Sequence, residues 1–92
     1  MDMNEKDWVA ELEREGYTQV AVCANGPDTD FGEHTHEEHT IHVILEGELT
    51  LTDETGSETL KRGQRFEIPA GTKHHAKCGP DGCTFVVGVK SE

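Results

Sequence analysis

The stretch GEHTHEEHTIHVILEG, residues 32–47, holds four of the six histidines and runs directly into an apolar segment. His34 and His36 are two positions apart, so on an extended strand their side chains share a face at a separation of roughly 7 Å. That separation suits two imidazoles that bind one metal ion. Surface histidines also produce such pairs, so the spacing alone leaves both interpretations open. His74 and His75 follow about thirty positions later.

From Tyr17 onward the sequence has the pattern of short β-strands divided by glycine and proline turns. Leu49 and Leu51, for example, alternate with threonines, as in a half-buried strand. Residues 79–82, Gly-Pro-Asp-Gly, are expected to form a turn between the last two strands. About eight antiparallel strands in a barrel or sandwich are expected, at residues 18–24, 31–36, 40–46, 49–52, 57–61, 64–68, 74–78 and 83–90.

One short N-terminal α-helix is expected at residues 4–15. Asn4 can cap it, and Asp7 stands where a capping box needs an acceptor. Gly16 is the stop signal. A narrow apolar stripe, formed by Trp8, Val9 and Leu12, predicts that the helix packs on the outside of the β-structure. Residues 1–92 are therefore expected to form a single domain, with the helix at 4–15 and the barrel at 17–90.

The chain is acidic, with 8 basic and 19 acidic residues and a formal charge of -11. This charge disfavours nucleic acid and anionic membranes as partners, because both would be repelled. No run of about 18 apolar residues is present, and the N-terminus lacks the pattern of a signal peptide, so a cytoplasmic location is expected. There the three cysteines are expected to be thiols, and their odd number argues against a complete disulfide framework.

Two segments resemble the two sequence motifs of the cupin superfamily. The first has His34, His36 and Gly47 at the expected places. The second, GQRFEIPAGTKH at residues 63–74, has a glycine, five residues, Pro-x-Gly, two residues and His74. The chain thus resembles a small single-domain cupin of the conserved-barrel type over residues 32–78. The resemblance implies an all-β fold, an antiparallel jelly-roll barrel, and a divalent transition metal (Zn, Fe, Ni, Cu or Mn) bound by His34, His36 and His74.

The sequence departs from the cupin pattern at the position of the carboxylate ligand, where Thr40 stands. Threonine is a poor ligand for these metals, so one interpretation is a site of three histidines with open positions. Another is a replacement ligand, for which His42 is the favoured residue because it shares the strand parity of Thr40. A hydrogen-bonded histidine inside the barrel is an equal alternative for His42. His39 and His75 are interpreted as solvated surface histidines.

Two functions from different classes fit these features. The first is a metal-dependent enzyme for a small organic molecule, either an oxygenase or a Lewis-acid isomerase or hydrolase. The second is a small-molecule binding or sensor module, with or without metal. Because only 33% of the residues are hydrophobic, a homodimer is expected to cover exposed edges. Cys78 and Cys83 are interpreted as buried thiols, with a disulfide or half of a metal site as alternatives.

Overall fold

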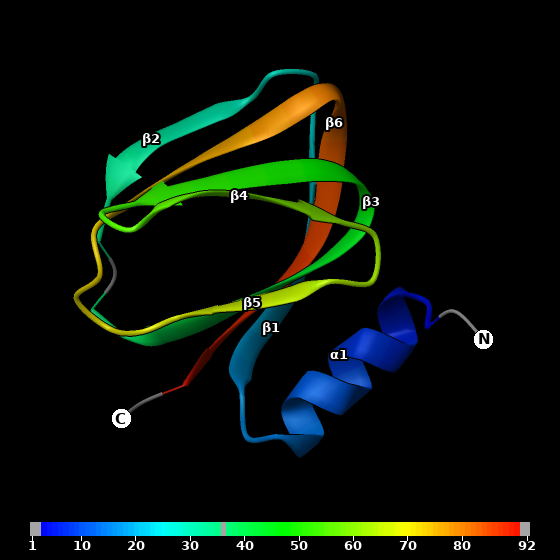
Figure 1. The fold of residues 1–92 in the computed structure, drawn as a ribbon. Coiled ribbons are helices and arrows are strands. Elements are labelled where there is room, and N and C mark those ends of the chain that lie inside the picture. The colour runs from blue at the N-terminus through cyan, green and yellow to red at the C-terminus, as the bar shows by residue number, and fades with distance from the viewer. Residues whose placement is uncertain (1–2, 36, 91–92) are drawn as a thin grey trace.

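A computed structural model describes residues 3–35 and 37–90, and for His34 it describes the backbone alone. The described chain is β-structure apart from one N-terminal helix, as the sequence predicts (Figure 1). Its elements are α1 (Glu5–Arg14), β1 (Thr18–Asn25), β2 (Asp30–His34), β3 (His39–Asp53), β4 (Gly56–Lys61), β5 (Arg65–Ile68) and β6 (His74–Lys90).

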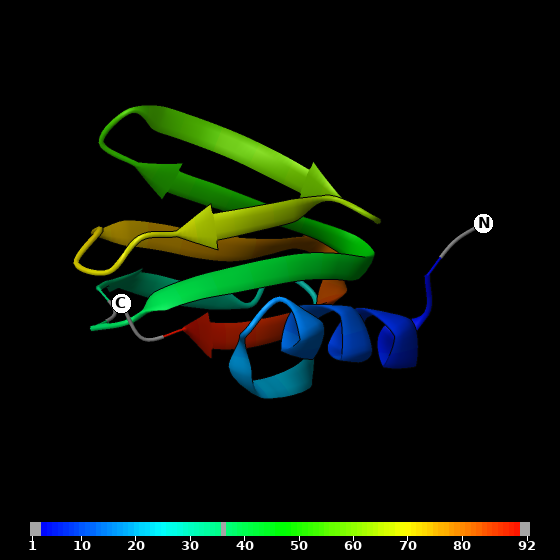
Figure 2. The same cartoon turned by 90° about the horizontal axis from the view of Figure 1, so that it is seen from below.

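Two long strands, β3 and β6, pair antiparallel along most of their length and take part in both layers of the fold. The first half of β3 pairs with β5 and with the second half of β6, which in turn pairs with β1. The second half of β3 pairs with β4 and with the first half of β6, which pairs with β2. The result is a jelly roll of two facing layers (Figures 1 and 2). In the described part, β1, β2, β4 and β5 each pair with one neighbour, so the sheet is not closed.

The layers meet where β3 and β6 bend together. Gly47 has a φ of +73° and Gly82 a φ of +80°. A Cβ atom on Gly47 would lie 2.1 Å from the carbonyl oxygen of Gly82, so only glycine permits this approach of the two backbones. The bend replaces two predicted interruptions. Residues 40–46 and 49–52 are one strand, and residues 79–82 form a bulge within β6 instead of a turn between two strands.

The reason for the difference is the pairing register. Along β3 the partners of Cys78 and Cys83 are Leu49 and Gly47, so β6 uses five positions where β3 uses two. The extra residues bulge out, and pairing continues on both sides of them. Six strands therefore replace the predicted eight within the described residues.

The helix has the predicted capping box at its N-terminus and packs through its predicted apolar stripe. The Asn4 side chain accepts a hydrogen bond from the Asp7 backbone at 2.9 Å, and the Asp7 carboxylate accepts from the Asn4 backbone at 3.1 Å. Leu12 is fully buried between the helix and the sheet, in a cluster with Tyr17, Ile41, Val43 and Val86. Within the described part of the chain, no helix has the length and apolar character that crossing a membrane requires.

A second apolar cluster fills the space between the two layers. It draws side chains from β3, β4, β5 and β6, and its members are almost completely buried. They are Ile44, Leu49, Leu51, Leu60, Ile68, Ala76, Cys78, Cys83 and Phe85. We refer to this set as the interior cluster. Several of its members lie on β3 and β6, the strands that also carry Thr40, His42 and His74.

Candidate functional site

His74 lies at the start of β6 and faces the interior. It is 5% exposed and alternates in register with Ala76 and Cys78, which belong to the interior cluster. Its Nδ1 atom lies 3.4 Å from the carbonyl oxygen of Thr72. A contact of this kind can fix the orientation of an imidazole ring.

The backbone of His34 pairs directly with that of His74 across β2 and β6. The topology therefore joins the two predicted motifs, which are forty positions apart in sequence, at one place in the sheet. His36 lies outside the described residues, as does the side chain of His34.

Thr40, the residue in the carboxylate position, is 3% exposed. It lies on β3 opposite Ile68 of β5 and alternates with Ile41, which packs under the helix, so Thr40 faces the interior. Its Oγ1 atom is buried and has no hydrogen-bond partner among the described residues. Buried hydroxyls are rarely left without a partner, so this atom marks a polar position inside the barrel.

His42 follows Thr40 on the same face of β3, one residue pair deeper. Its ring packs edge-on against Phe85 of the interior cluster, with centroids 5.1 Å apart and an interplanar angle of 62°. The neighbours of His42 in the sheet are Phe66 and Val87. The corresponding neighbours of Thr40, Ile68 and Val89, are apolar as well.

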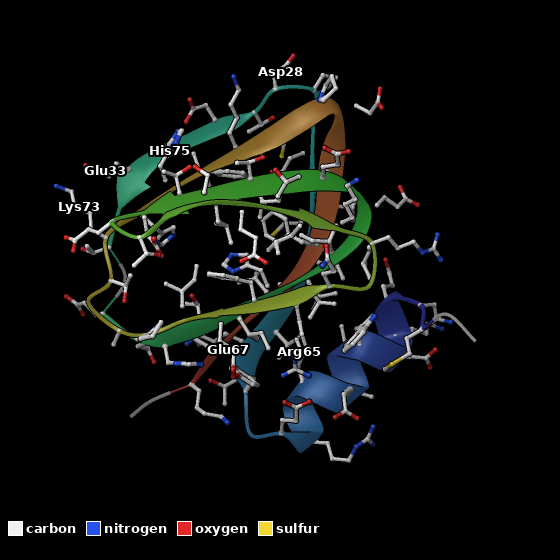
Figure 3. All side chains as sticks on the ribbon, viewed as in Figure 1. Asp28, Glu33, Arg65, Glu67, Lys73 and His75 are labelled. Carbon is white, nitrogen blue, oxygen red and sulfur yellow. The ribbon has the colours of Figure 1, made fainter. Side chains whose placement is uncertain are left out.

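His75 lies on the opposite face of β6 from His74. Its Nε2 atom is 2.6 Å from Oδ1 of Asp30 on β2. The pKa of Asp30 is lowered, first by the backbone amide of Gly32 and then by His75. Figure 3 shows His75 with Glu33 and Lys73 on the outer side of β2 and β6, where the Lys73 Nζ and Glu33 Oε1 atoms are 3.2 Å apart. These contacts brace the edge strand that carries His34.

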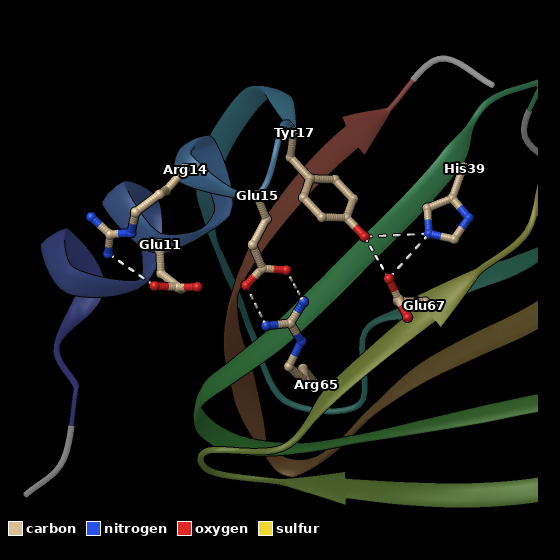
Figure 4. A network of polar contacts seen from close by, with 7 residues as sticks. All are labelled: Glu11, Arg14, Glu15, Tyr17, His39, Arg65 and Glu67. Carbon is tan, nitrogen blue, oxygen red and sulfur yellow. Dashed lines mark hydrogen bonds and ion pairs between the residues drawn. The ribbon is translucent and has the colours of Figure 1, made fainter.

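His39 belongs to a polar network that sequence reasoning missed (Figure 4). The Tyr17 hydroxyl donates a 2.6 Å hydrogen bond to Glu67 Oε1, and His39 Nε2 lies 3.3 Å from the hydroxyl and 3.4 Å from the carboxylate. Burial, and then the bond to Glu67, raises the pKa of Tyr17 to about 12. The bond from Tyr17 is the main cause that lowers the pKa of Glu67.

A second part of the network joins the end of the helix to β5. Arg65 donates two hydrogen bonds, of 2.8 and 2.6 Å, to the Glu15 carboxylate. The bond to Arg65 is the main cause that lowers the pKa of Glu15 to about 2. These partners lie 22 to 50 positions apart in sequence, and no spacing rule joins them. The network ties the C-terminal end of α1 to β3 and β5, on the outside of the barrel.

The described side chains alone do not complete a metal site. Among residues 3–33, 35 and 37–90, no group of three or more His, Cys, Asp or Glu side chains is arranged to hold a metal ion. Two of the three predicted ligands, His34 and His36, contribute side chains from outside that set. The site consequently stays a prediction, to which the structure adds a buried His74 and the pairing of its backbone with His34.

Comparisons with known proteins agree with this architecture. The chain is 36% identical over 75 residues to a pyrimidine/purine nucleoside phosphorylase from Pseudomonas syringae pv. tomato, covering 79% of this chain and 76% of that protein. An RmlC-like cupin from Shewanella frigidimarina superimposes with a TM-score of 0.71 at 19% identity, over 79% of this chain and 65% of that one. KdgF from Halomonas sp. superimposes with a TM-score of 0.66 at 21% identity, over 79% and 68%.

The structural matches are below 25% identity and show the shared fold alone. This chain spans just under two thirds of the Shewanella protein. The family model described as the cupin domain matches residues 22–87, from within β1 to near the end of β6. The chain therefore belongs to the cupin domain family.

Proposed function

We propose that this cupin binds a divalent transition metal ion through His34, His36 and His74, and uses it to act on a small organic molecule. The observation that carries the proposal is the placement of His74. It is buried at the interior face of β6, and its backbone partner in the sheet is His34. A pairing of this kind brings together two histidines from motifs that are far apart in the sequence.

The residues present fit a borderline metal ion. Neutral imidazoles suit zinc, iron, nickel, copper or manganese, and a buried imidazole avoids the cost of carrying a charge into the interior. The buried Oγ1 atom of Thr40 also fits. As a hydroxyl it can donate to or accept from a polar group inside the barrel, such as an oxygen atom of a bound substrate.

Thr40 and His42 divide the remaining roles. Thr40 supplies no negative charge, so an ion held by three neutral histidines keeps its full positive charge. His42 is the candidate for a fourth ligand or for a residue that touches the substrate, and its contact with Phe85 orients its ring. When bound, the ion would supply Lewis-acid polarisation of a substrate oxygen or a place for dioxygen. Residues of β3 and β6 would shape the pocket and exclude water.

Elemental analysis of protein purified without a histidine tag or chelating column tests this proposal. We expect one equivalent of metal per chain, lost in His34→Ala and His74→Ala. The matched control is His75→Ala, since His75 is the next residue on β6 and pairs with Asp30 on the outside. Metal content that is unchanged in the His34 and His74 variants refutes the assignment. Metal-dependent turnover would separate an enzyme from the alternative, a binding or sensor module.

A second candidate activity is suggested by the Pseudomonas relative, which is 36% identical and named as a pyrimidine/purine nucleoside phosphorylase. On this proposal the chain cleaves a nucleoside with inorganic phosphate. Release of free base from a panel of nucleosides, followed by ultraviolet absorbance with and without phosphate, tests it. Activity that persists in His74→Ala would separate this reaction from the metal site. The proposal is contradicted if no nucleoside in the panel releases its base in a phosphate-dependent way.

We also propose that the protein is a cytoplasmic homodimer. The described edge strands each keep one unpaired side, and Val22 on β1 is 38% exposed. A second copy could cover such an edge and its apolar side chains. Light scattering at high micromolar concentration should give the mass of a dimer, and a monomer there would contradict the proposal.

A further inference from the structure

Two of the three cysteines lie together inside the barrel, away from the start of β6 where His74 stands. Cys78 and Cys83 are 2% and 3% exposed, carry free thiols, and both belong to the interior cluster. The two thiols are close enough that Cys78 helps to raise the pKa of Cys83. The proposed metal site and reaction make no use of this pair.

The bulge in β6 is what brings the pair together. The β3 partners of Cys78 and Cys83 are Leu49 and Gly47, which are two positions apart. Two positions along a strand span about 6.6 Å, so the Cα atoms of the cysteines are expected at a similar separation. Disulfides join residues whose Cα atoms are about 4.4–6.8 Å apart. An unbulged strand would hold positions 78 and 83 at roughly 16 Å, too far to be bridged.

The third cysteine is less well placed. Cys23 on β1 lies directly opposite Phe85, and Asn25 is the residue opposite Cys83. Cys23 and Cys83 are therefore diagonal neighbours, and such neighbours lie about 7–8 Å apart. That separation is beyond the usual range for a disulfide. The register thus favours Cys78 as the partner of Cys83.

We propose that Cys78 and Cys83 form a redox modification site, a buried dithiol that a small peroxide converts into an intrachain disulfide. One thiol releases its proton and the thiolate sulfur attacks a peroxide oxygen. The O–O bond breaks, and the departing hydroxide takes up a proton, so that a sulfenic acid and water are formed. The second thiol sulfur then attacks the sulfenic sulfur, the S–O bond breaks, and a second water leaves. Two electrons pass from the dithiol to the peroxide, and hydrogen peroxide ends as two molecules of water.

The surroundings of the two thiols set how fast they are oxidised and what the disulfide does to stability. Burial, and then the neighbouring Cys78 thiol, raises the pKa of Cys83 to about 12. The thiolate is the reactive form, so oxidation is slow at neutral pH and speeds up as the pH rises. The bulge is also held to the β1–β2 connection, since the Cys78 amide donates to Thr29 and the Asp28 amide donates to Gly79. A disulfide would lock this bulge and stabilise the bend between the layers.

Mass spectrometry of the full chain tests the proposal without depending on any variant. Reduced protein is treated with hydrogen peroxide, unfolded in the presence of iodoacetamide, and digested with trypsin. Cleavage after Lys77 and Lys90 leaves both cysteines in the peptide 78–90, whereas Cys23 lies in another peptide. We expect peptide 78–90 to lose two hydrogen atoms and take up no alkyl group, while Cys23 is alkylated.

The matched control is Cys23→Ser, in which the loss of two hydrogens should persist. Cys78→Ser and Cys83→Ser should abolish it, with circular dichroism confirming that each variant is folded. Oxidised protein should also unfold at a higher denaturant concentration than reduced protein. Alkylation of both cysteines after peroxide, separate overoxidation of each thiol, or a cross-link to the peptide that holds Cys23 would overturn the proposal.

Discussion

Replacing Gly47 by alanine should be one of the most damaging small changes in this protein. Gly47 sits at the common bend of β3 and β6 with a φ of +73°. A Cβ atom there would lie 2.1 Å from the carbonyl oxygen of Gly82 and 3.1 Å from the Cα atom of Cys83. Both obstacles are backbone, so they cannot move aside without disturbing the strand pairing.

The magnitude has two parts. A left-handed conformation costs a residue with a Cβ atom about 1–2 kcal/mol. Forcing extra atoms into a packed region costs a further amount of about 1–3 kcal/mol. The free energy of unfolding should therefore fall by about 2–5 kcal/mol. A chain of 92 residues has a total stability of only about 5–14 kcal/mol, so the variant should be close to unfolding.

Gly63 provides the matched control. It has a φ of +85°, but a Cβ atom there would meet nothing within 4 Å. Gly63→Ala should cost only the conformational part, about 1–2 kcal/mol. Urea unfolding followed by circular dichroism measures both variants. Equal losses for Gly47→Ala and Gly63→Ala would show that the close contact of the two bends does not hold the layers together.

Four further variants test the packing and the polar network. Leu12→Ala should lower the free energy of unfolding in urea by about 2–5 kcal/mol, because this side chain is fully buried between α1 and the sheet. Tyr17→Phe removes the hydrogen bond to Glu67 and should raise the pKa of Glu67 toward 4.5. Because the folded-state pKa of Glu67 is depressed, its contribution exists above about pH 4.5 and is lost as the pH falls through the folded pKa, so acid should destabilise the variant less than the parent. Arg65→Gln should cost about 0.2–1 kcal/mol at neutral pH, since the pair with Glu15 is partly exposed. The same sign applies to Glu15, whose contribution is lost as the pH falls toward about 2, and a double-mutant cycle with Glu15→Gln should recover the coupling. Two results would count against these assignments. One is a free energy of unfolding that falls in acid by the same amount for Tyr17→Phe as for the parent, and the other is a coupling energy of zero between Arg65 and Glu15.

The parts of the fold that depend on local chemistry were predictable. The cap at Asn4 and the burial of Leu12 follow from residues close together in sequence, and both are confirmed. The two bends were not predictable. A Gly-Pro-Asp-Gly segment has the same local preferences in a hairpin turn and in a bulge, and only its pairing with β3 decides between them.

The candidate site divides in the same way. Strand alternation was sufficient to predict that His42 lies on the same face as Thr40, whereas the interior position of His74 was expected from the resemblance to cupins. All three residues face the interior in the structure. The pairing of His34 with His74 required the topology. The polar network of Tyr17, His39 and Glu67 required it too, because contacts between distant strands leave no periodic signal in the sequence.

The central claim is that three histidines hold one metal ion inside this barrel. Titration of tag-free, chelator-treated protein with Co²⁺ tests it most directly, because the visible absorption of the ion reports its ligands. The account predicts one Co²⁺ per chain, with no sulfur-to-metal charge-transfer band, since imidazoles and not thiolates are the ligands. Binding should be lost in His74→Ala and kept in His75→Ala. A failure to bind, a thiolate band, or binding that survives in His74→Ala would contradict it.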